Sequence, residues 1–202
     1  MTRPFALVAT SLTALTVLAA CRGGGALNDD PYRQGRVEAL MDSGPKVDRA
    51  DGADFSKFDA VLVADVTVNP EATQGDDVSA EQLDKLRADF QSRLADAFAA
   101  GRTVRTGNGA AGAGTLVVNA EIVRAVPNKP ARNLAPQTQL TRTGYGYAAV
   151  RLTMVDGATG ATLLTMTDTQ STQRFGTAKL SEWGTVEKAF STWAEEAAKL
   201  AK

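Results

Sequence analysis

Residues 79–101 read SAEQLDKLRADFQSRLADAFAAG and carry the clearest helical periodicity in the chain. Ser79 and Gln82 form an S-x-x-Q capping box, in which the hydroxyl and the side-chain amide each satisfy a backbone N–H of the first turn. Gly101 suits the C-terminal cap. Apolar side chains recur along one stripe of this helix: Leu83, Leu86, Phe90, Leu94, Ala97 and Phe98. The stretch therefore predicts a long amphipathic helix with one buried face.

Alternating apolar residues predict strands before and after this helix. The stretch FDAVLVADVTV, residues 58–68, alternates on one face and is partly apolar on the other, which is typical of a central strand. The turn sequence DGATG, residues 156–160, joins two alternating stretches and predicts an antiparallel hairpin with a glycine at positive φ. The remaining predicted strands are 103–105, 116–126, 147–155 and 161–170.

The last 22 residues, 181–202, read SEWGTVEKAFSTWAEEAAKLAK and predict a second helix. Its apolar stripe comprises Val186, Ala189 or Phe190, Trp193, Ala197 and Leu200. Two helices among several strands predict an α+β fold, with a largely antiparallel sheet of four to five strands and both long helices packed on one face. This arrangement is a two-layer sandwich.

The N-terminal residues resemble an export signal that ends in a bacterial lipobox. Arg3 gives a positive start, and the apolar stretch 5–18 is shorter than the roughly 20 residues needed to span a bilayer. Leu18, Ala19, Ala20 and Cys21 follow, so we expect cleavage between Ala20 and Cys21 and lipidation of the Cys21 thiol. A buried structural cysteine, or an ordinary secretory signal, are the alternatives. Residues 1–20 are the predicted signal peptide.

The residues after the lipobox predict the location and a tether. Arg22 stands where enterobacterial lipoproteins retained at the inner membrane carry aspartate, so by resemblance to that sorting rule we expect an outer membrane lipoprotein. Residues 21–55 mix Gly, Asp, Pro and Arg with few apolar side chains, which is typical of a flexible tether. The predicted α+β domain covers residues 56–202 and faces the periplasm.

Composition argues against several classes of function. The formal net charge of -1 gives no field to hold nucleic acid, so we expect no nucleic-acid partner. The chain has no histidine, which removes the commonest general base and zinc ligand, and its single cysteine forbids an internal disulfide. We expect no metal, no cofactor and no enzymatic activity.

Three patterns of catalytic type have plainer structural explanations. Residues 107–112, GNGAAG, match G-x-G-x-x-G but lead into a predicted strand, whereas a nucleotide site needs a helix there. Asp59 and Asp65 are too far apart along an extended strand for the paired carboxylates of a glycosidase. Lys179 could form a dyad with Ser171 or Ser181, but no local pattern positions these side chains.

Two further pairs of residues are assigned structural roles. Asp76 and Asp77 precede the first long helix, where their charge complements the helix dipole better than it indicates a calcium site. Trp193 lies on the apolar stripe of the last helix and is assigned to the core. Trp183, at the entrance of that helix, is as well suited to a partner contact as to the core.

The loop 127–146 is the predicted partner-binding segment, because loops on a rigid scaffold carry binding surfaces. It contains Arg132, Arg142 and Tyr145 and is bracketed by prolines. Together with Trp183, these three residues are the candidate contacts for an envelope protein partner.

The order of segments resembles a family of bacterial lipoproteins, domain of unknown function 3313. The resemblance rests on the lipobox and tether, on FDAVLVADVTVNP (58–70), VSAEQLDKL (78–86), DGATGATLL (156–164) and WGTVEKAFSTWA (183–194), and covers residues 55–202. One departure is the polar character of residues 43–57, where such proteins usually carry an apolar-aromatic segment. The family supplies no activity, so the resemblance implies none.

The expected function is therefore that of a membrane-anchored envelope lipoprotein with a non-enzymatic accessory or partner-binding domain in the periplasm. The alternative is a domain that binds cell-wall glycan or lipid, or hydrolyses such a substrate with carboxylates. Binding of wall fragments would distinguish this alternative, because a ligand at 100 times its dissociation constant adds about 2.7 kcal/mol to stability.

Overall fold

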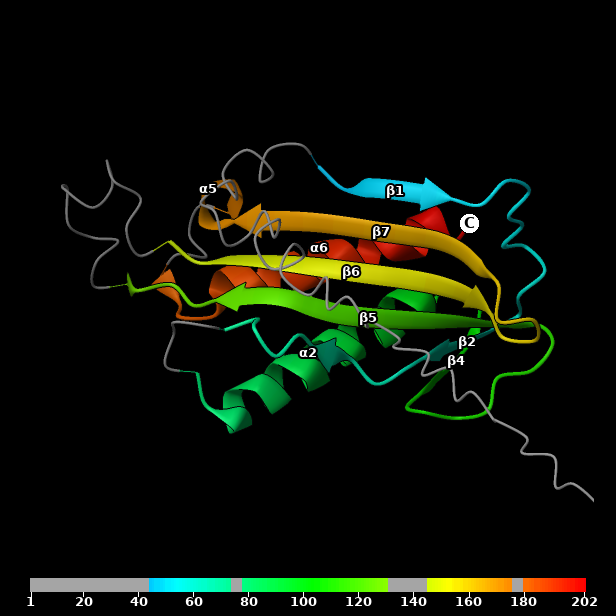
Figure 1. The fold of residues 1–202 in the computed structure, drawn as a ribbon, viewed down its shortest axis with the longest axis horizontal. Coiled ribbons are helices and arrows are strands. Elements are labelled where there is room, and N and C mark those ends of the chain that lie inside the picture. The colour runs from blue at the N-terminus through cyan, green and yellow to red at the C-terminus, as the bar shows by residue number, and fades with distance from the viewer. Residues whose placement is uncertain (1–43, 74–77, 131–144, 176–179) are drawn as a thin grey trace, which may run out of the picture.

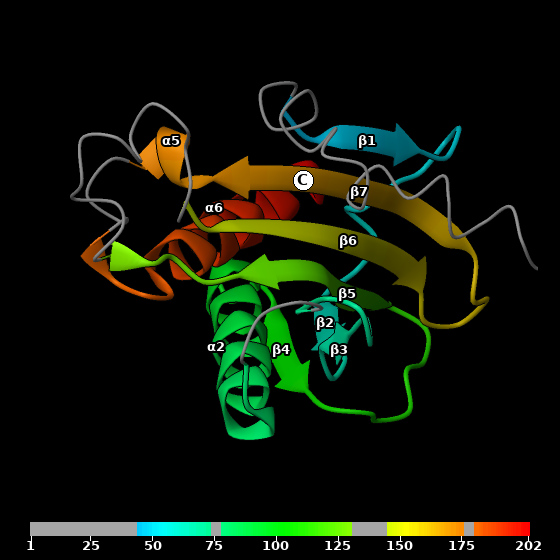
Figure 2. The same ribbon diagram turned by 60° about the vertical axis from the view of Figure 1, so that its left-hand side comes forward.

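A computed structural model describes residues 44–73, 78–130, 145–175 and 180–202. These residues form one seven-stranded sheet with the strand order β1-β7-β6-β5-β2-β4, in which β3 also pairs with β5. The strands are β1 (Lys46–Arg49), β2 (Ala60–Val63), β3 (Thr67–Val68), β4 (Thr103–Thr106), β5 (Thr115–Val126), β6 (Tyr147–Asp156) and β7 (Thr162–Ser171). The helices are α2 (Ala80–Phe98), the short α5 (Thr172–Phe175) and α6 (Gly184–Leu200). Figures 1 and 2 show this arrangement from two sides.

The first long helix, α2, confirms the expectation from its sequence. The Ser79 hydroxyl accepts the Gln82 N–H at 3.2 Å and the Gln82 side chain accepts the Ser79 N–H at 2.9 Å, so the capping box is complete. The helix ends at Phe98, and Gly101 adopts a φ of 98° in the turn that follows. The buried side of the helix comprises Leu86, Phe90, Leu94 and Phe98.

The sheet is mixed and larger than the largely antiparallel sheet of four to five strands that we expected. β2 pairs in parallel with both β4 and β5, and β3 also pairs in parallel with β5. The reason is that α2 returns the chain between β3 and β4, and the connection 107–114 returns it again between β4 and β5, so β2, β3, β4 and β5 run in the same direction. The α+β class itself is confirmed.

The stretch 58–68 forms two short strands where one strand was predicted. β2 ends at Val63 and β3 begins at Thr67, and both lie against β5.

Another strand, β1, lies inside the segment expected to be a tether and pairs antiparallel with β7. Its four residues are all exposed and lack apolar alternation, so the sequence pattern gave no sign of it. The described fold therefore begins before the boundary that we placed near Phe55.

The hairpin of β6 and β7 is antiparallel, as predicted. At its turn the Asp156 carboxylate accepts the N–H groups of Ala158 at 2.9 Å and Thr159 at 3.2 Å, and Gly160 has a φ of 72°. Lys57 donates to the other oxygen of Asp156 at 2.8 Å, which ties the turn to the segment before β2. These hydrogen bonds lower the pKa of Asp156 to about 2, with the Lys57 contact as the largest cause.

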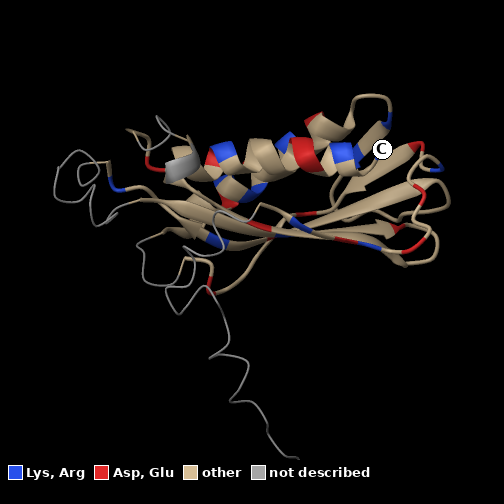
Figure 3. Cartoon of the chain, turned by 90° about the horizontal axis from the view of Figure 1, so that it is seen from above, with Lys and Arg blue, Asp and Glu red and all other residues tan. Residues whose placement is uncertain are grey.

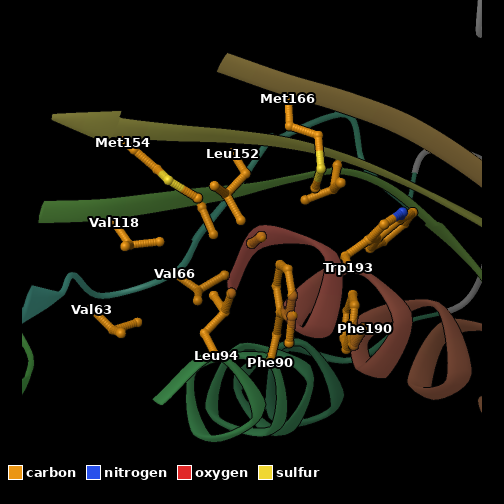
Figure 4. Close-up of a cluster of buried hydrophobic side chains, with 14 of the residues drawn as sticks. Val63, Val66, Phe90, Leu94, Val118, Leu152, Met154, Met166, Phe190 and Trp193 are labelled. Carbon is orange, nitrogen blue, oxygen red and sulfur yellow. The ribbon is translucent and has the colours of Figure 1, made fainter. Parts of the chain in front are cut away.

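The hydrophobic core lies between the sheet and the helix pair α2 and α6 (Figure 4). Phe90 of α2 stacks on Phe190 of α6 with ring centroids 4.4 Å apart, and Trp193 packs at a tilt against both rings. Trp193 is 1% exposed, which confirms its assignment to the core. Figure 3 shows α6, the helix that ends near the C-terminus, along one face of the sheet, with acidic and basic residues distributed along its length. None of the described helices combines the length and apolar character that crossing a bilayer requires.

Candidate functional site

The best-organised polar site lies at the end of the sheet where β5 ends, β6 begins, β7 ends and α6 begins. Asn128, 2% exposed, is at its centre. Its Oδ1 accepts the Gly146 N–H at 2.8 Å and lies 2.7 Å and 3.1 Å from the hydroxyls of Thr172 and Thr185. Its Nδ2 donates to the carbonyl of Ser181 at 2.7 Å. One buried side chain thus joins four segments that are distant in sequence.

Gly146 is fitted closely to this cluster. A Cβ atom at position 146 would lie 2.7 Å from the Asn128 Oδ1 and 2.7 Å from the carbonyl oxygen of Val126. Neither neighbour can move freely, because the asparagine is held by hydrogen bonds and the carbonyl belongs to the backbone. Only glycine therefore allows the start of β6 to approach the end of β5 so closely.

The exposed surface over this cluster is partly apolar. Leu180 is 59% exposed and is one of two large hydrophobic residues that stand out on the described surface. Trp183 and Tyr145 are half-buried and lie within two positions of residues of the cluster. We call residues 127–130, 145–146, 172–175 and 180–185 the loop end. The loop end includes two of the four predicted partner contacts, Tyr145 and Trp183.

Several predicted residues lie outside the described part of the chain. Arg132 and Arg142, the two basic candidates of the loop 127–146, are among them, and so are Asp76, Asp77 and Lys179. The lipidation site Cys21 and the cleavage residue Ala20 lie in the undescribed N-terminal segment. Because Lys179 lies outside the described residues, the structure does not test our expectation that it forms no dyad with Ser171 or Ser181.

A second polar group lies between β7 and α6. The Asp168 carboxylate, 5% exposed, accepts the Trp193 indole N–H at 2.7 Å and the Gln170 amide N–H at 2.8 Å, both on Oδ2. The other oxygens, Asp168 Oδ1 and Gln170 Oε1, have no hydrogen-bond partner among the residues that the structure describes. Burying acceptors without donors costs free energy, so this pair is a weak point of an otherwise apolar interface.

The two aspartates of the first predicted strand have separate surroundings. Asp65 accepts hydrogen bonds from Gln91 at 3.2 Å and from Asn108 at 2.6 Å. Asp59 is exposed, and its backbone pairs with Gly114 and Thr103. Asp65 thus fixes α2 and the loop after β4 to the sheet, which is the structural role that we preferred for it.

The glycine-rich segment 107–112 connects β4 to β5 and leads into a strand, as the sequence indicated. The hydrogen bond from Asn108 to Asp65 and the left-handed φ of 97° at Gly107 hold its first turn against the sheet. No helix N-terminus follows these glycines in the structure, so the geometry that a nucleotide-binding turn requires is absent from this connection.

A cavity of about 410 Å³ lies between the C-terminal ends of α2 and α6. Its lining includes Arg102, Lys199, Lys202 and Glu195. Helix C-termini expose unpaired carbonyl groups that carry partial negative charge. Arg102 donates to one of these carbonyls, that of Ala201, at 2.6 Å. Arg102 thereby compensates the C-terminal end of α6, and we assign no anion site to this cavity.

Asn128 and Asp168 were not singled out from the sequence. Asn128 follows Pro127 in a loop, where asparagine is common for local reasons, so it gave no signal. The sequence did contain a signal for Asp168, because this residue occupies a position of β7 that alternates with Leu164 and Met166 and therefore points into the core.

Within the described residues no group of three or more acidic, cysteine or histidine side chains could hold a metal ion.

Comparisons with known proteins identify a family and give distant structural likenesses. The family model described as "Protein of unknown function (DUF3313)" matches residues 38–197. No curated protein sequence matches the chain. Among solved structures, the PelC dodecamer from Paraburkholderia phytofirmans is 14% identical, with 75% of this chain and 94% of that chain covered and a TM-score of 0.45.

Two further solved structures are similar at the same level. Protein XCC0632 from Xanthomonas campestris, of family DUF330, is 11% identical, with 69% of this chain and 81% of that chain covered and a TM-score of 0.41. The hypothetical protein CT253 from Chlamydia trachomatis is 13% identical, with 70% of this chain and 97% of that chain covered and a TM-score of 0.41.

Proposed function

The chain belongs to the family of proteins of unknown function DUF3313, and from this premise we propose that it is an outer membrane lipoprotein anchored through Cys21. Its periplasmic domain binds an envelope protein through the loop end and catalyses no reaction. The lipobox at residues 18–21 supports the anchor, and the organisation of the loop end supports the binding role.

The single observation that carries the binding role is the contrast between the interior and the surface of the loop end. Inside, Asn128 is hydrogen-bonded to three neighbouring segments, and Gly146 fits against it with no room for a side chain. Outside, Leu180 is 59% exposed beside the half-buried Trp183. An ordered backbone that presents apolar and aromatic side chains to solvent loses little entropy on binding, which favours a docking surface.

The chemistry of this surface favours a protein over a glycan as the partner. A branched aliphatic side chain such as Leu180 gains free energy by burial in an apolar pocket, and tryptophan and tyrosine are enriched at protein interfaces. A sugar ring needs a flat exposed aromatic face, whereas the three aromatic side chains of the loop end, Tyr145, Phe175 and Trp183, are half-buried. The partner should therefore offer an apolar pocket to Leu180.

In-cell photo-crosslinking tests this proposal. A photoreactive amino acid at position 180, in the full-length protein in its own membrane, should give an adduct with one envelope protein, and position 145 should give the same adduct. Ala158 is the matched control, because it is exposed at the opposite end of the sheet in the β6–β7 turn. Adducts of equal yield from position 158, or none from positions 180 and 145, would refute the docking surface.

A thermal-shift experiment on the purified protein distinguishes a protein partner from the glycan alternative. If purified wall fragments raise the unfolding temperature of the full-length protein and Leu180→Asp removes this shift, the loop end binds glycan and the proposal is wrong. We expect no shift with any fragment, because none of the aromatic side chains described in the loop end is fully exposed for stacking.

A further inference from the structure

We propose that two copies of the chain associate through β1, the exposed edge strand of the sheet. The two strands would pair antiparallel about a two-fold axis that passes between the two Val47 residues. This association goes beyond binding of an envelope protein at the loop end, since it uses another part of the molecule. Figure 1 shows β1 along the margin of the sheet, next to β7.

The pairing of β1 with β7 determines which backbone groups of β1 remain free. Ala50 donates its N–H to Leu163 at 2.9 Å, and the two residues stand opposite each other in the register that pairs Arg49 with Leu164. In an antiparallel ladder the residues that bond to one neighbour alternate with those that point away. The N–H and C=O groups of Val47 and Arg49 therefore point to the outer edge.

These groups allow three registers with a second copy, and the charges favour one of them. Centred on Val47, the strands place each Lys46 opposite the Asp48 of the other copy. Centred on Asp48, they bring two carboxylates together, and centred on Arg49, they bring two guanidinium groups together. Opposite charges directly across two strands stabilise the pairing and like charges destabilise it, so the register centred on Val47 is preferred.

The side chains at this edge are free for such a contact. Val47 is 40% exposed and is the second large hydrophobic residue that stands out on the described surface. Lys46 and Asp48 are exposed and make no ion pair within the described residues. Two copies would bury both Val47 side chains against each other and pair the four free charges.

Arg49 does not interfere with this arrangement. Its guanidinium lies 4.7 Å from the centre of the Phe55 ring and donates to the carbonyl of Ala53 at 3.1 Å, so the side chain is held by its own subunit. Pro45, which precedes the strand, has no N–H and ends the ladder. The contact is therefore short and closes as a dimer, because a two-fold axis uses the same edge in both copies.

Zero-length crosslinking tests the predicted contact directly. A carbodiimide joins a lysine to a carboxylate only when the two groups touch. We would mix full-length protein labelled with ¹⁵N and unlabelled full-length protein in membranes, so that a mixed-isotope peptide pair reports a bond between copies. The expected product links Lys46 of one copy to Asp48 of the other. Absence of this mixed product in membranes at native density would overturn the proposal.

Charge reversal provides the matched variants. Lys46→Asp and Asp48→Lys each place like charges across the axis, and each should weaken self-association about tenfold or more. A mixture of the two variants restores opposite charges, so an excess of mixed dimers is expected by sedimentation of isotope-labelled or fluorescently labelled full-length protein in detergent. Both substitutions lie at exposed positions and should leave the unfolding temperature unchanged. Dimerisation that is indifferent to both single reversals would exclude this interface.

Discussion

The indole Nε1 of Trp193 donates a hydrogen bond to Oδ2 of Asp168 at 2.7 Å, in an interface where both side chains are almost fully buried. This contact joins α6 to β7 at a point where the sheet would otherwise present a carboxylate to an apolar helix. It also gives Trp193 a role beyond packing, because the indole N–H supplies a donor to a buried carboxyl oxygen.

Trp193→Phe should lower the free energy of unfolding by about 1–3 kcal/mol beyond the cost of the smaller ring, because Oδ2 then keeps only the Gln170 donor. Urea denaturation followed by circular dichroism measures this difference. Trp183→Phe is the matched control, since that half-buried indole makes no side-chain hydrogen bond that the described residues show. Equal losses for the two variants would contradict a special role for the contact with Asp168.

Asn128→Ala should destabilise the protein by about 1–3 kcal/mol, because it leaves the buried Gly146 N–H without its acceptor and removes the hydrogen bond to the Ser181 carbonyl. Asn119→Ala, at an exposed position of β5, should change the free energy of unfolding by less than about 0.5 kcal/mol. Chemical denaturation measures the free energy of unfolding of both variants. The account of the loop end fails if the two substitutions cost the same.

The Lys57 contact with Asp156 predicts a specific dependence of stability on pH. Because the pKa of Asp156 falls from 3.8 to about 2 on folding, its stabilising contribution is present above pH 3.8 and disappears as the pH falls toward 2. Asp156→Asn keeps an acceptor for the turn but removes the charge. The difference in unfolding temperature between the wild type and this variant should therefore shrink over that interval.

Lys57→Gln is the control for this dependence. It removes the largest cause of the lowered pKa but leaves the N–H groups of Ala158 and Thr159 in place. We expect a smaller pH dependence than in the wild type and a larger one than in Asp156→Asn. A difference between the wild type and Asp156→Asn that stays constant from pH 6 to pH 2 would be inconsistent with the described contact.

Leu180→Asp should abolish docking without changing stability, because the side chain is 59% exposed. The yield of the adduct from a crosslinker at position 145 measures docking, and the unfolding temperature measures stability. Ala158→Asp, which adds the same charge at the far end of the sheet, should leave the adduct unchanged. An undiminished adduct in Leu180→Asp would remove Leu180 from the docking surface.

Local sequence patterns were enough to predict the elements that bury one face and expose the other, and the turn that joins β6 to β7. The stripe from Leu86 to Phe98 and the capping box at Ser79 located α2, and the DGATG turn located the β6–β7 hairpin. The parallel pairing of β2 was not visible locally, because it depends on where α2 returns the chain. β1 was missed because the exposed sequence KVDR has no apolar alternation and pairs only through its backbone.

The candidate site was predictable in part. Tyr145 and Trp183 were chosen for their residue types and both lie in the loop end, and their role in binding a partner stays a prediction. Asn128, whose hydrogen bonds organise the loop end, was not predicted, because its partners are separated from it by up to 57 positions along the sequence. Contacts between residues so far apart in sequence are determined by the tertiary fold and produce no recognisable local sequence pattern.

The proposal depends most directly on the chemical state of Cys21. Mass spectrometry of the N-terminal peptide from protein extracted from its native membrane measures this state. The account predicts a mature chain that begins at Cys21 and carries a diacylglyceryl group with palmitate-type acyl chains, and a Cys21→Ser protein that retains residues 1–20 without acylation. A native chain with an unmodified Cys21 thiol would contradict the anchor and with it the proposed function.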